Sequence, residues 1–168
     1  MAGIRIAMKC SGVSRQRRSL NTWLITKNHF SSMEIRSYNP DTDYAQLEAL
    51  LKDESTFGGV YDPARDAAER LAANPESILV AEVEGELVGT VTVFENGRIA
   101  WLFRFAVKEA YEATAVPALF EKAKERIAAL GHTQFEVYAP VGVEKFITRY
   151  EALGFTKGND YTAFWQDV

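Results

Sequence analysis

Hydrophobic residues recur with two different periods along this chain, and each change of period marks a new element. Residues 33–38 alternate between apolar and polar, which predicts a first strand. A turn over residues 39–43 carries helix-start chemistry, and leucines at helical spacing predict a helix over residues 44–51. A second helix is predicted over residues 64–73, behind a loop over residues 57–63 that contains two glycines.

The middle of the chain predicts three strands joined by tight turns. Two apolar runs, residues 78–83 and 87–93, are separated by a short turn. The pair Asn96-Gly97 is a strong hairpin signal, because it tolerates the positive φ angles of a type I′ turn. The third strand, residues 99–107, is apolar on both faces apart from one arginine, so we expect it in the centre of the sheet.

The last part of the chain alternates between helix and strand. A long helix with one apolar stripe is stopped by Gly131, and residues 134–138 predict a strand. A helix over residues 144–153 and a final strand over residues 161–166 follow. Because a strand–helix–strand unit has parallel strands whereas hairpins are antiparallel, the order predicts a single-domain α/β fold. Its sheet is mixed but mostly antiparallel, with helices on both faces.

Composition excludes several classes of protein. The length of 168 residues suits one domain with a real core, and no apolar run approaches the ~20 residues of a membrane-spanning helix. The single cysteine, Cys10, cannot form an internal disulfide, which fits a reducing compartment. With His29 and His132 it makes a set too small and scattered for a zinc site, so we expect no metal.

Charge is distributed unevenly. Residues 1–32 hold six of the 19 Lys and Arg residues and no Asp or Glu, so the remainder has a net charge of −10. An acidic body argues against nucleic-acid binding and suits a cationic or amine-bearing partner. The basic segment is either a targeting peptide or a poorly ordered or upstream-translated extension, with the folded domain beginning at Met33 and spanning residues 33–168. We favour the extension, and with it a cytoplasmic protein.

Two segments carry the candidate chemistry. Phe103 to Val107 reads as a buried strand that runs through a short loop into a helix, and a helix start leaves backbone N–H groups that bind anions. The sequence Tyr150-Glu151-Ala152-Leu153-Gly154-Phe155 follows later. Together they resemble the acyl-CoA signature of the GNAT N-acyltransferase superfamily, over about residues 33–168. The resemblance implies that backbone at Phe105, Ala106 and Val107 holds the pantetheine arm and polarises the thioester carbonyl.

The loop that would hold the CoA diphosphate departs from the family pattern. The pattern has Arg or Gln, then two residues, then Gly, any residue, and Gly or Ala. Glu112 places a negative charge beside a diphosphate, Ala115 adds a methyl group, and Pro117 lacks an N–H. Thr114 is a candidate cap for the helix. The proposed cofactor-binding residues of the loop are Glu112, Ala113, Thr114, Ala115, Val116, Pro117 and Ala118.

Tyr150 matches the family's tyrosine, which protonates the departing thiolate as a general acid. Val143 stands where the family often has Asn. A general base is not evident, although Glu136 lies nearest the expected cleft and a water relay is an alternative. Phe57, Tyr61 and Tyr138 are candidates to line an acceptor pocket, with core packing as the other interpretation of each.

The favoured hypothesis is an N-acetyltransferase that moves an acetyl group from acetyl-CoA to a primary amine by direct attack in a ternary complex. The acceptor would be a small molecule or a peptide, with neither nucleic acid nor membrane as partner. The alternative is a GNAT-fold binding or regulatory module with little activity, motivated by Glu112, Ala115, Pro117 and Val143. A homodimer or a partner-dependent subunit also fits the sequence.

Overall fold

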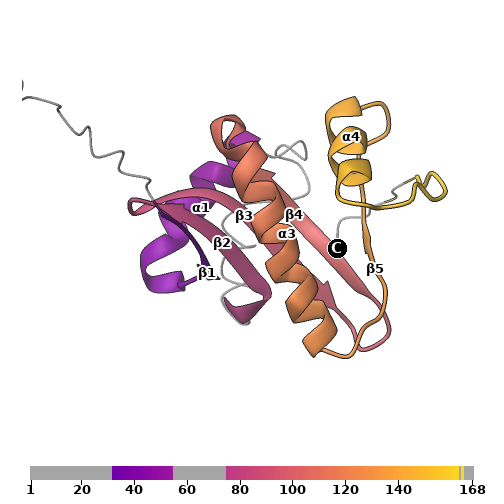
Figure 1. Cartoon of the computed structure of the whole chain (residues 1–168), viewed down its shortest axis with the longest axis horizontal. Coiled ribbons are helices and arrows are strands. Elements are labelled where there is room, and N and C mark those ends of the chain that lie inside the picture. Colours follow the sequence, from indigo (N-terminus) through magenta and orange to yellow (C-terminus); the bar gives the residue numbers. More distant parts are fainter. Residues whose placement is uncertain (1–31, 55–74, 163, 165–168) are drawn as a thin grey trace, which may run out of the picture. The chain divides into compact units, whose positions relative to one another are not determined.

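The computed structural model describes residues 32–54, 75–162 and 164, and in them a five-stranded sheet carries helices on its two faces (Figure 1). In chain order the elements are β1 (Met33–Ser37), α1 (Pro40–Glu54), the 3-10 turn η1 (Pro75–Ser77), β2 (Ile78–Val83), β3 (Glu86–Glu95), β4 (Ala100–Val107), the 3-10 turn η2 (Glu109–Tyr111), α3 (Glu112–Ala129), β5 (Phe135–Val137) and α4 (Glu144–Ala152).

The strands lie in the order in which they occur in the chain, β1-β2-β3-β4-β5. The first four are antiparallel, as expected for strands joined by tight turns. β5 follows α3 and is parallel to β4, with pairs from Ala100–Phe135 to Leu102–Val137. This arrangement confirms the predicted mixed, mostly antiparallel sheet with β4 inside it.

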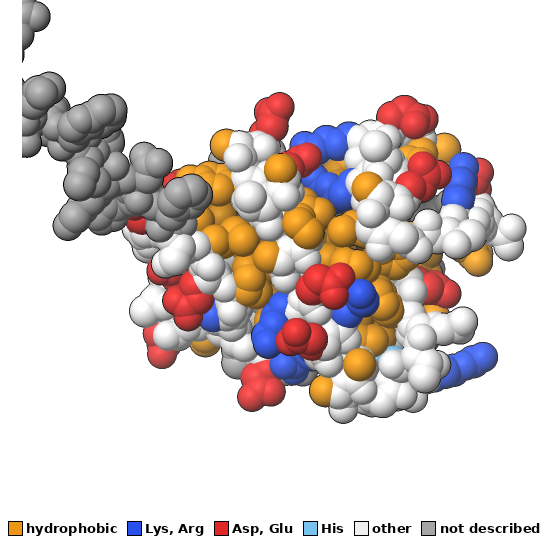
Figure 2. All heavy atoms as spheres, in the orientation of Figure 1, with side chains coloured by type: hydrophobic (Ala, Val, Ile, Leu, Met, Phe, Trp, Pro, Cys, Tyr) orange, Lys and Arg blue, Asp and Glu red, His pale blue; other side chains and the backbone are white. Residues whose placement is uncertain are grey.

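Alternation along the strands sends apolar side chains to two separate cores. On β2, Ile78 and Val80 pack with Leu47 of α1. Their neighbours Leu79 and Ala81 join the larger cluster under α3. Because successive strand residues point to opposite faces, α1 and α3 cover opposite faces of the sheet, and the predicted fold class is confirmed. Acidic and basic side chains are interspersed over the side of α3 that faces the viewer in Figure 2.

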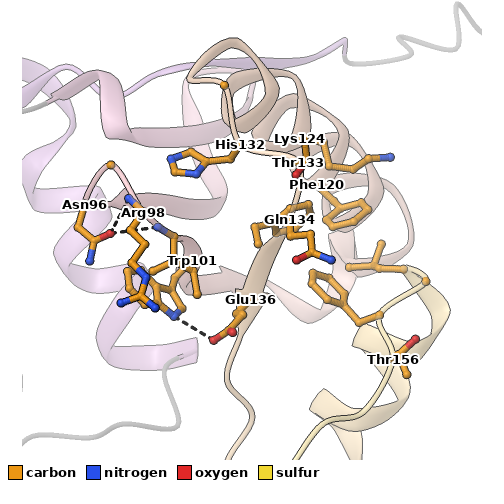
Figure 3. Close-up of a pocket in the computed structure, with 17 residues that line it drawn as sticks. Asn96, Arg98, Trp101, Phe120, Lys124, His132, Thr133, Gln134, Glu136 and Thr156 are labelled. Carbon is orange, nitrogen blue, oxygen red and sulfur yellow. Dashed lines mark hydrogen bonds between the residues drawn. The ribbon is translucent and has the colours of Figure 1, made fainter.

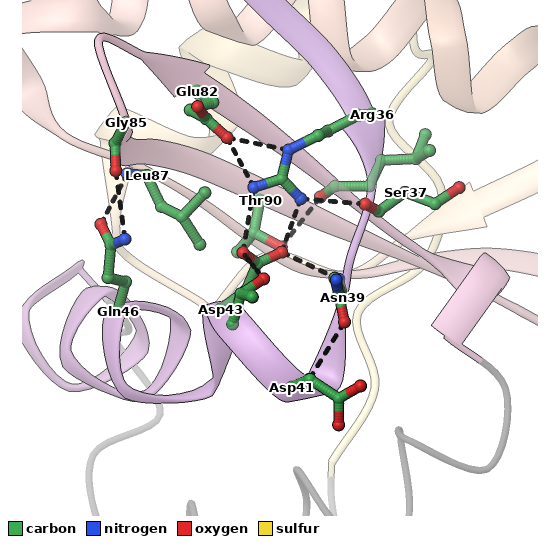
Figure 4. A network of polar contacts seen from close by, with 12 residues as sticks. Arg36, Ser37, Asn39, Asp41, Asp43, Gln46, Glu82, Gly85, Leu87 and Thr90 are labelled. Carbon is green, nitrogen blue, oxygen red and sulfur yellow. Dashed lines mark hydrogen bonds and ion pairs between the residues drawn. The ribbon is translucent and has the colours of Figure 1, made fainter.

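A buried ionic network fixes α1 to the edge of the sheet (Figure 4). The Asp43 side chain is almost fully buried and binds the Arg36 guanidinium, with Nη1 2.6 Å from Oδ2. Arg36 also binds Glu82 on β2. Burial alone would raise the pKa of Asp43, but the hydrogen bonds from Arg36, Asn39 and Thr42 lower it overall. Asn39 in turn caps α1 by accepting the Asp41 N–H at 3.1 Å.

The hairpins form as predicted, but the turn geometry at Asn96-Gly97 was predicted wrongly. Only Gly97 of this pair has a positive φ, 77°. The Asn96 side-chain oxygen instead accepts the N–H groups of Arg98 and Ile99, at 3.1 and 3.0 Å, which holds a different turn. Two consecutive positive φ angles occur at the other hairpin, where Glu84 has 52° and Gly85 has 84°.

The predicted last strand is wrong for its described residues, because Tyr161, Thr162 and Phe164 lie in irregular backbone. Tyr161 and Phe164 are 72% and 91% exposed, so no neighbouring strand buries them. The predicted loop over 57–63, the helix over 64–73 and all but Ser32 of the extension lie outside the described residues. No helix in the described part of the chain combines the length and apolarity required to cross a membrane.

Candidate active site

β4 and β5 pair over only three residues and then diverge. Their last pair is Leu102–Val137, and β5 runs away from β4 toward α4 (Figure 1). The register between β3 and β4 also shifts at Thr90–Thr92, and Arg104 has a φ of 51°, so β4 carries a bulge just past the last β5 pair. The strand is therefore bent at the point where its neighbour leaves.

The three strand residues predicted to hold the cofactor lie beyond this parting. Phe105, Ala106 and Val107 are 6%, 4% and 1% exposed, and Phe105 and Val107 belong to the core cluster under α3. Their side chains are therefore occupied by packing. Only their backbone could meet a ligand, which is how the sequence predicted them to act.

α3 begins earlier than the sequence indicated. Its first residue is Glu112, directly after η2, and Thr114 lies inside the helix, where its hydroxyl donates to the Tyr111 carbonyl at 3.2 Å. The predicted Thr114 cap is therefore wrong. The reason is the 3-10 turn, in which the Tyr111 N–H binds the Lys108 carbonyl at 2.8 Å and starts the helical backbone early.

This earlier start changes which amides could bind an anion. Only the first four N–H groups of a helix lack an intrahelical partner, and those of Tyr111 and Glu112 bind carbonyls of the preceding turn. Ligand-facing donors would thus come from Ala113 and Thr114. Pro117 is the sixth residue of α3, so its missing N–H would have bound the Ala113 carbonyl within the helix and not a ligand.

Glu112 meets two cations that the sequence did not associate with it. Its Oε1 lies 2.7 Å from Lys145 Nζ and 2.5 Å from Arg149 Nη2, both on α4. Burial alone would raise the pKa of Glu112, but the hydrogen bonds and charges of Lys145 and Arg149 lower it overall. The three side chains together carry a charge of about +1 at neutral pH, so the negative charge of Glu112 is more than offset within this group.

Arg149 connects this cluster to the bent strand. Its side chain is only 8% exposed, and its Nη1 donates to the Phe105 carbonyl at 3.2 Å. The guanidinium lies over the rings of Phe105 and Phe146, 5.8 and 5.3 Å from their centroids. Its buried Nε has no hydrogen-bond partner among the described residues. Arg149 directly precedes the motif that begins at Tyr150, but the sequence gave no signal for its partners, because they are distant in the chain.

Tyr150 is positioned by the end of α4. The Phe155 N–H binds the Tyr150 carbonyl at 3.0 Å, the Gly154 N–H binds the Glu151 carbonyl at 2.9 Å, and Gly154 has a φ of 88°. These bonds form a Schellman ending, which also packs the Phe155 ring 5.9 Å from that of Tyr150. Burial raises the pKa of Tyr150, with a smaller opposing effect of Arg149. The phenol therefore keeps its proton at neutral pH, as a general acid requires.

A second polar group lies on the sheet face opposite α3. Trp101 Nε1 lies 3.2 Å from Glu136 Oε2 (Figure 3). It also lies 3.2 Å from the Tyr138 hydroxyl, which donates to Glu136 at 3.0 Å. The Trp101 hydrogen bond would lower the pKa of Tyr138, but Glu136 and burial raise it overall. Tyr138 is the first residue after the last β4–β5 pair, so this group stands where the strands part.

Figure 3 also shows a pocket lined by the β3–β4 turn, β5 and the chain around residues 131–134 and 153–156. It includes Trp101 and Glu136 but none of Phe105, Glu112 or Tyr150, so it is not the predicted cofactor site. No group of three or more His, Cys, Asp or Glu side chains within residues 32–54, 75–162 and 164 is placed to hold a metal ion.

The fold combines a bent inner strand, a neighbouring strand that diverges from it and a helix that starts beside them, and comparison with known proteins assigns its family. The model of the acetyltransferase (GNAT) family matches residues 44–142. The chain belongs to this family. The predicted superfamily, and with it a GNAT-type N-acetyltransferase, is thereby confirmed.

Individual relatives agree with the assignment. The chain is 26% identical over 124 residues to acetyltransferase SG1711 of Sodalis glossinidius, covering 73% of this chain and 87% of that protein. A structure of AAC(6')-Iy with the bisubstrate analog CoA-S-monomethyl-acetylneamine shares the fold, with a TM-score of 0.67 at 17% identity, over 82% of this chain and 100% of that one. A crystal structure from Pyrococcus horikoshii matches with a TM-score of 0.59 at 22% identity, over 77% of this chain but only 45% of its own length.

Proposed function

We propose that this chain transfers an acetyl group from acetyl-CoA to a primary amine. The observation that carries the proposal is the contact of Arg149 with the Phe105 carbonyl, 3.2 Å long. This hydrogen bond links Arg149, the neighbour of Tyr150 in the chain, to the bent part of β4. Backbone groups of that part of β4 would hold the thioester. A solved neighbour, AAC(6')-Iy, binds a CoA bisubstrate analog on the same fold, which supports CoA as the donor.

The reaction would proceed by direct attack of the amine on the thioester carbon. Backbone N–H groups near Phe105 and Val107 would stabilise the oxyanion that forms. The C–S bond then breaks, and the departing thiolate takes the Tyr150 proton. The attacking nitrogen gives up its own proton to a base, for which Glu136, directly or through water, is the nearest candidate among the described residues.

The acceptor would approach from the sheet face that carries Trp101, Glu136 and Tyr138. A carboxylate that Trp101 and Tyr138 hold by hydrogen bonds attracts an ammonium group through its charge. The net charge of −10 outside the basic segment acts in the same direction. We therefore infer a cationic amine, on a small molecule or a peptide, as the acceptor, and we keep the cytoplasm as the proposed compartment.

A second function, a binding module without turnover, is favoured by one observation. The Glu112 carboxylate lies at the start of α3, where an anionic ligand would sit, and already binds both nearby cations. Saturable binding of acetyl-CoA without acetyl transfer to any amine would identify this function.

The test is thiol release from acetyl-CoA in the presence of a panel of polyamines, aminoglycosides and peptide N-termini. Tyr150→Phe should lower kcat by about 10²-fold or more and leave acetyl-CoA affinity unchanged, since the ring still packs on Phe155. Tyr44→Phe, on α1, is the matched control and should behave as wild type. Equal kcat for Tyr150→Phe and wild type would remove Tyr150 from the mechanism.

A further inference from the structure

We propose that Lys145 and Arg149 of α4 form the cation pair that binds the CoA diphosphate, and that the Glu112 carboxylate is an internal competitor for the same pair. The inference rests on the proposed function for the identity of its ligand. It assigns to this chain an inhibitory contact that an incoming diphosphate must displace.

The three groups converge on a single atom. Glu112 Oε1 accepts from both Lys145 Nζ, at 2.7 Å, and Arg149 Nη2, at 2.5 Å. Glu112 is also the first residue of α3, where the helix dipole and the amides of Ala113 and Thr114 favour negative charge. A carboxylate oxygen thus lies between two cations, on the residue that begins a helix.

Arg149 stays in place when the carboxylate leaves. Arg149 is held by the Phe105 carbonyl and by the rings of Phe105 and Phe146, and only 8% of its side chain is exposed. Its Nε, buried and without a hydrogen-bond partner among the described residues, belongs to the same guanidinium. The Glu112 side chain is 30% exposed and can rotate outward. The buried Arg149 guanidinium would then lack an anion, which an incoming diphosphate would supply.

Charge balance favours exchange of the carboxylate for a diphosphate. When only the Glu112 carboxylate is bound, the two cations keep an excess of one positive charge. A diphosphate carries more negative charge and more acceptor oxygens than this carboxylate. Arg suits such oxygens because its planar fork donates two parallel hydrogen bonds. Lys108, the lysine just before η2, pairs with Glu86 at 2.6 Å, so the cations for this position come from α4.

The experiment compares the affinities of three probes for the full-length chain: acetyl-CoA, inorganic pyrophosphate and S-acetylpantetheine, which lacks the diphosphate. Glu112→Gln should tighten acetyl-CoA and pyrophosphate by about threefold to tenfold, and Lys145→Gln should weaken both by a similar factor. Lys145→Arg should restore affinity. S-acetylpantetheine should be unaffected by any of these changes.

The exposed pair Glu121–Lys124, elsewhere on α3, supplies the matched controls. Glu121→Gln and Lys124→Gln should leave the affinity for all three probes at the wild-type value. Thermal unfolding of each variant establishes that it is folded at the temperature of the titration. A purely structural ion pair would move the melting temperature of Glu112→Gln without tightening any anion.

The outcomes separate this inference from the proposed function. Pyrophosphate affinity that is equal in wild type, Glu112→Gln and Lys145→Gln overturns the inference, and so does the absence of saturable pyrophosphate binding to Glu112→Gln. Pyrophosphate binding in the expected order without any binding of acetyl-CoA overturns the proposed function and supports the anion site.

Discussion

The ion pair between Glu112 and Arg149 should make a measurable contribution to folding stability, and a double-mutant cycle isolates it. The single changes are Glu112→Gln and Arg149→Met, and the double variant removes both charges. Met retains much of the apolar contact of Arg149 with Phe105 and Phe146. The cycle therefore changes charge and hydrogen bonding more than packing.

The magnitude follows from how deeply the partners are buried. Removing one partner of a buried pair typically costs ~3–5 kcal/mol, because the other charge is left without compensation. Arg149 is 8% exposed, but Glu112 is 30% exposed and Lys145 lies beside it, so solvent reduces the cost. We expect each single variant to lose about 2 kcal/mol of unfolding free energy, and the double variant to lose less than the sum by about 1–2 kcal/mol.

The assay is urea unfolding of the four proteins at pH 7, with thermal unfolding as a second probe. A loss of about 2 kcal/mol corresponds to roughly 4–8 °C in Tm for a chain of this size. Glu121→Gln, which breaks an exposed pair on the same helix, is the control and should stay close to wild type. Strictly additive losses in the double variant would refute the coupling between Glu112 and Arg149.

The same cycle has a pH dependence of known sign. The pKa of Glu112 is lower in the folded chain than its ordinary value, so the contribution of its carboxylate to stability is present above that ordinary value. It is lost as the pH falls from about 4.3 through the folded pKa. The stability difference between wild type and Glu112→Gln should therefore shrink with acidification, and a difference that grows would contradict the assignment.

Two further predictions concern the scaffold. Asp43→Asn leaves Glu82 as the remaining ion-pair partner of Arg36, in a site where Asp43 is 2% exposed. The unfolding free energy, measured in urea, should therefore fall by about 2–4 kcal/mol. Because the pKa of Asp43 is lowered, that loss should diminish as the pH falls below the ordinary range of Asp, and a loss independent of pH would contradict it. Gly89→Val should cost about 1–3 kcal/mol, since a Cβ there would lie 3.0 Å from side-chain carbons of Leu119 and Val107; an unchanged Tm would show that the core yields.

Sequence patterns predicted those elements that are determined by residues close together in the chain. The nearly continuous apolar run over residues 78–83 follows from a strand buried on both faces, and Gly131 and Gly154 end α3 and α4 through positive φ angles of 88°. At both helix ends, the N–H groups of the glycine and of the next residue donate hydrogen bonds to carbonyls of the last helical turn. A glycine at this position predicts such an ending from the sequence.

The helix start at Glu112 and the partners of Glu112 were not predictable in this way. The start depends on a 3-10 turn held by the bond between Tyr111 and Lys108, for which Thr114 gave a misleading signal. Arg149 is 37 residues from Glu112 and 44 from Phe105, so only the fold brings them together. Comparison of Glu112 alone with the family motif therefore indicated repulsion of a diphosphate. In the folded chain, the group of Glu112, Lys145 and Arg149 has an excess of positive charge.

Binding of acetyl-CoA to the full-length chain tests the central claim most directly. Calorimetry should show saturable binding, and acetyl-CoA at about 100 times its Kd should stabilise the fold by ~2.7 kcal/mol, or roughly 5–11 °C in Tm. No heat of binding and no change in Tm at millimolar acetyl-CoA would contradict the claim that this fold uses acetyl-CoA.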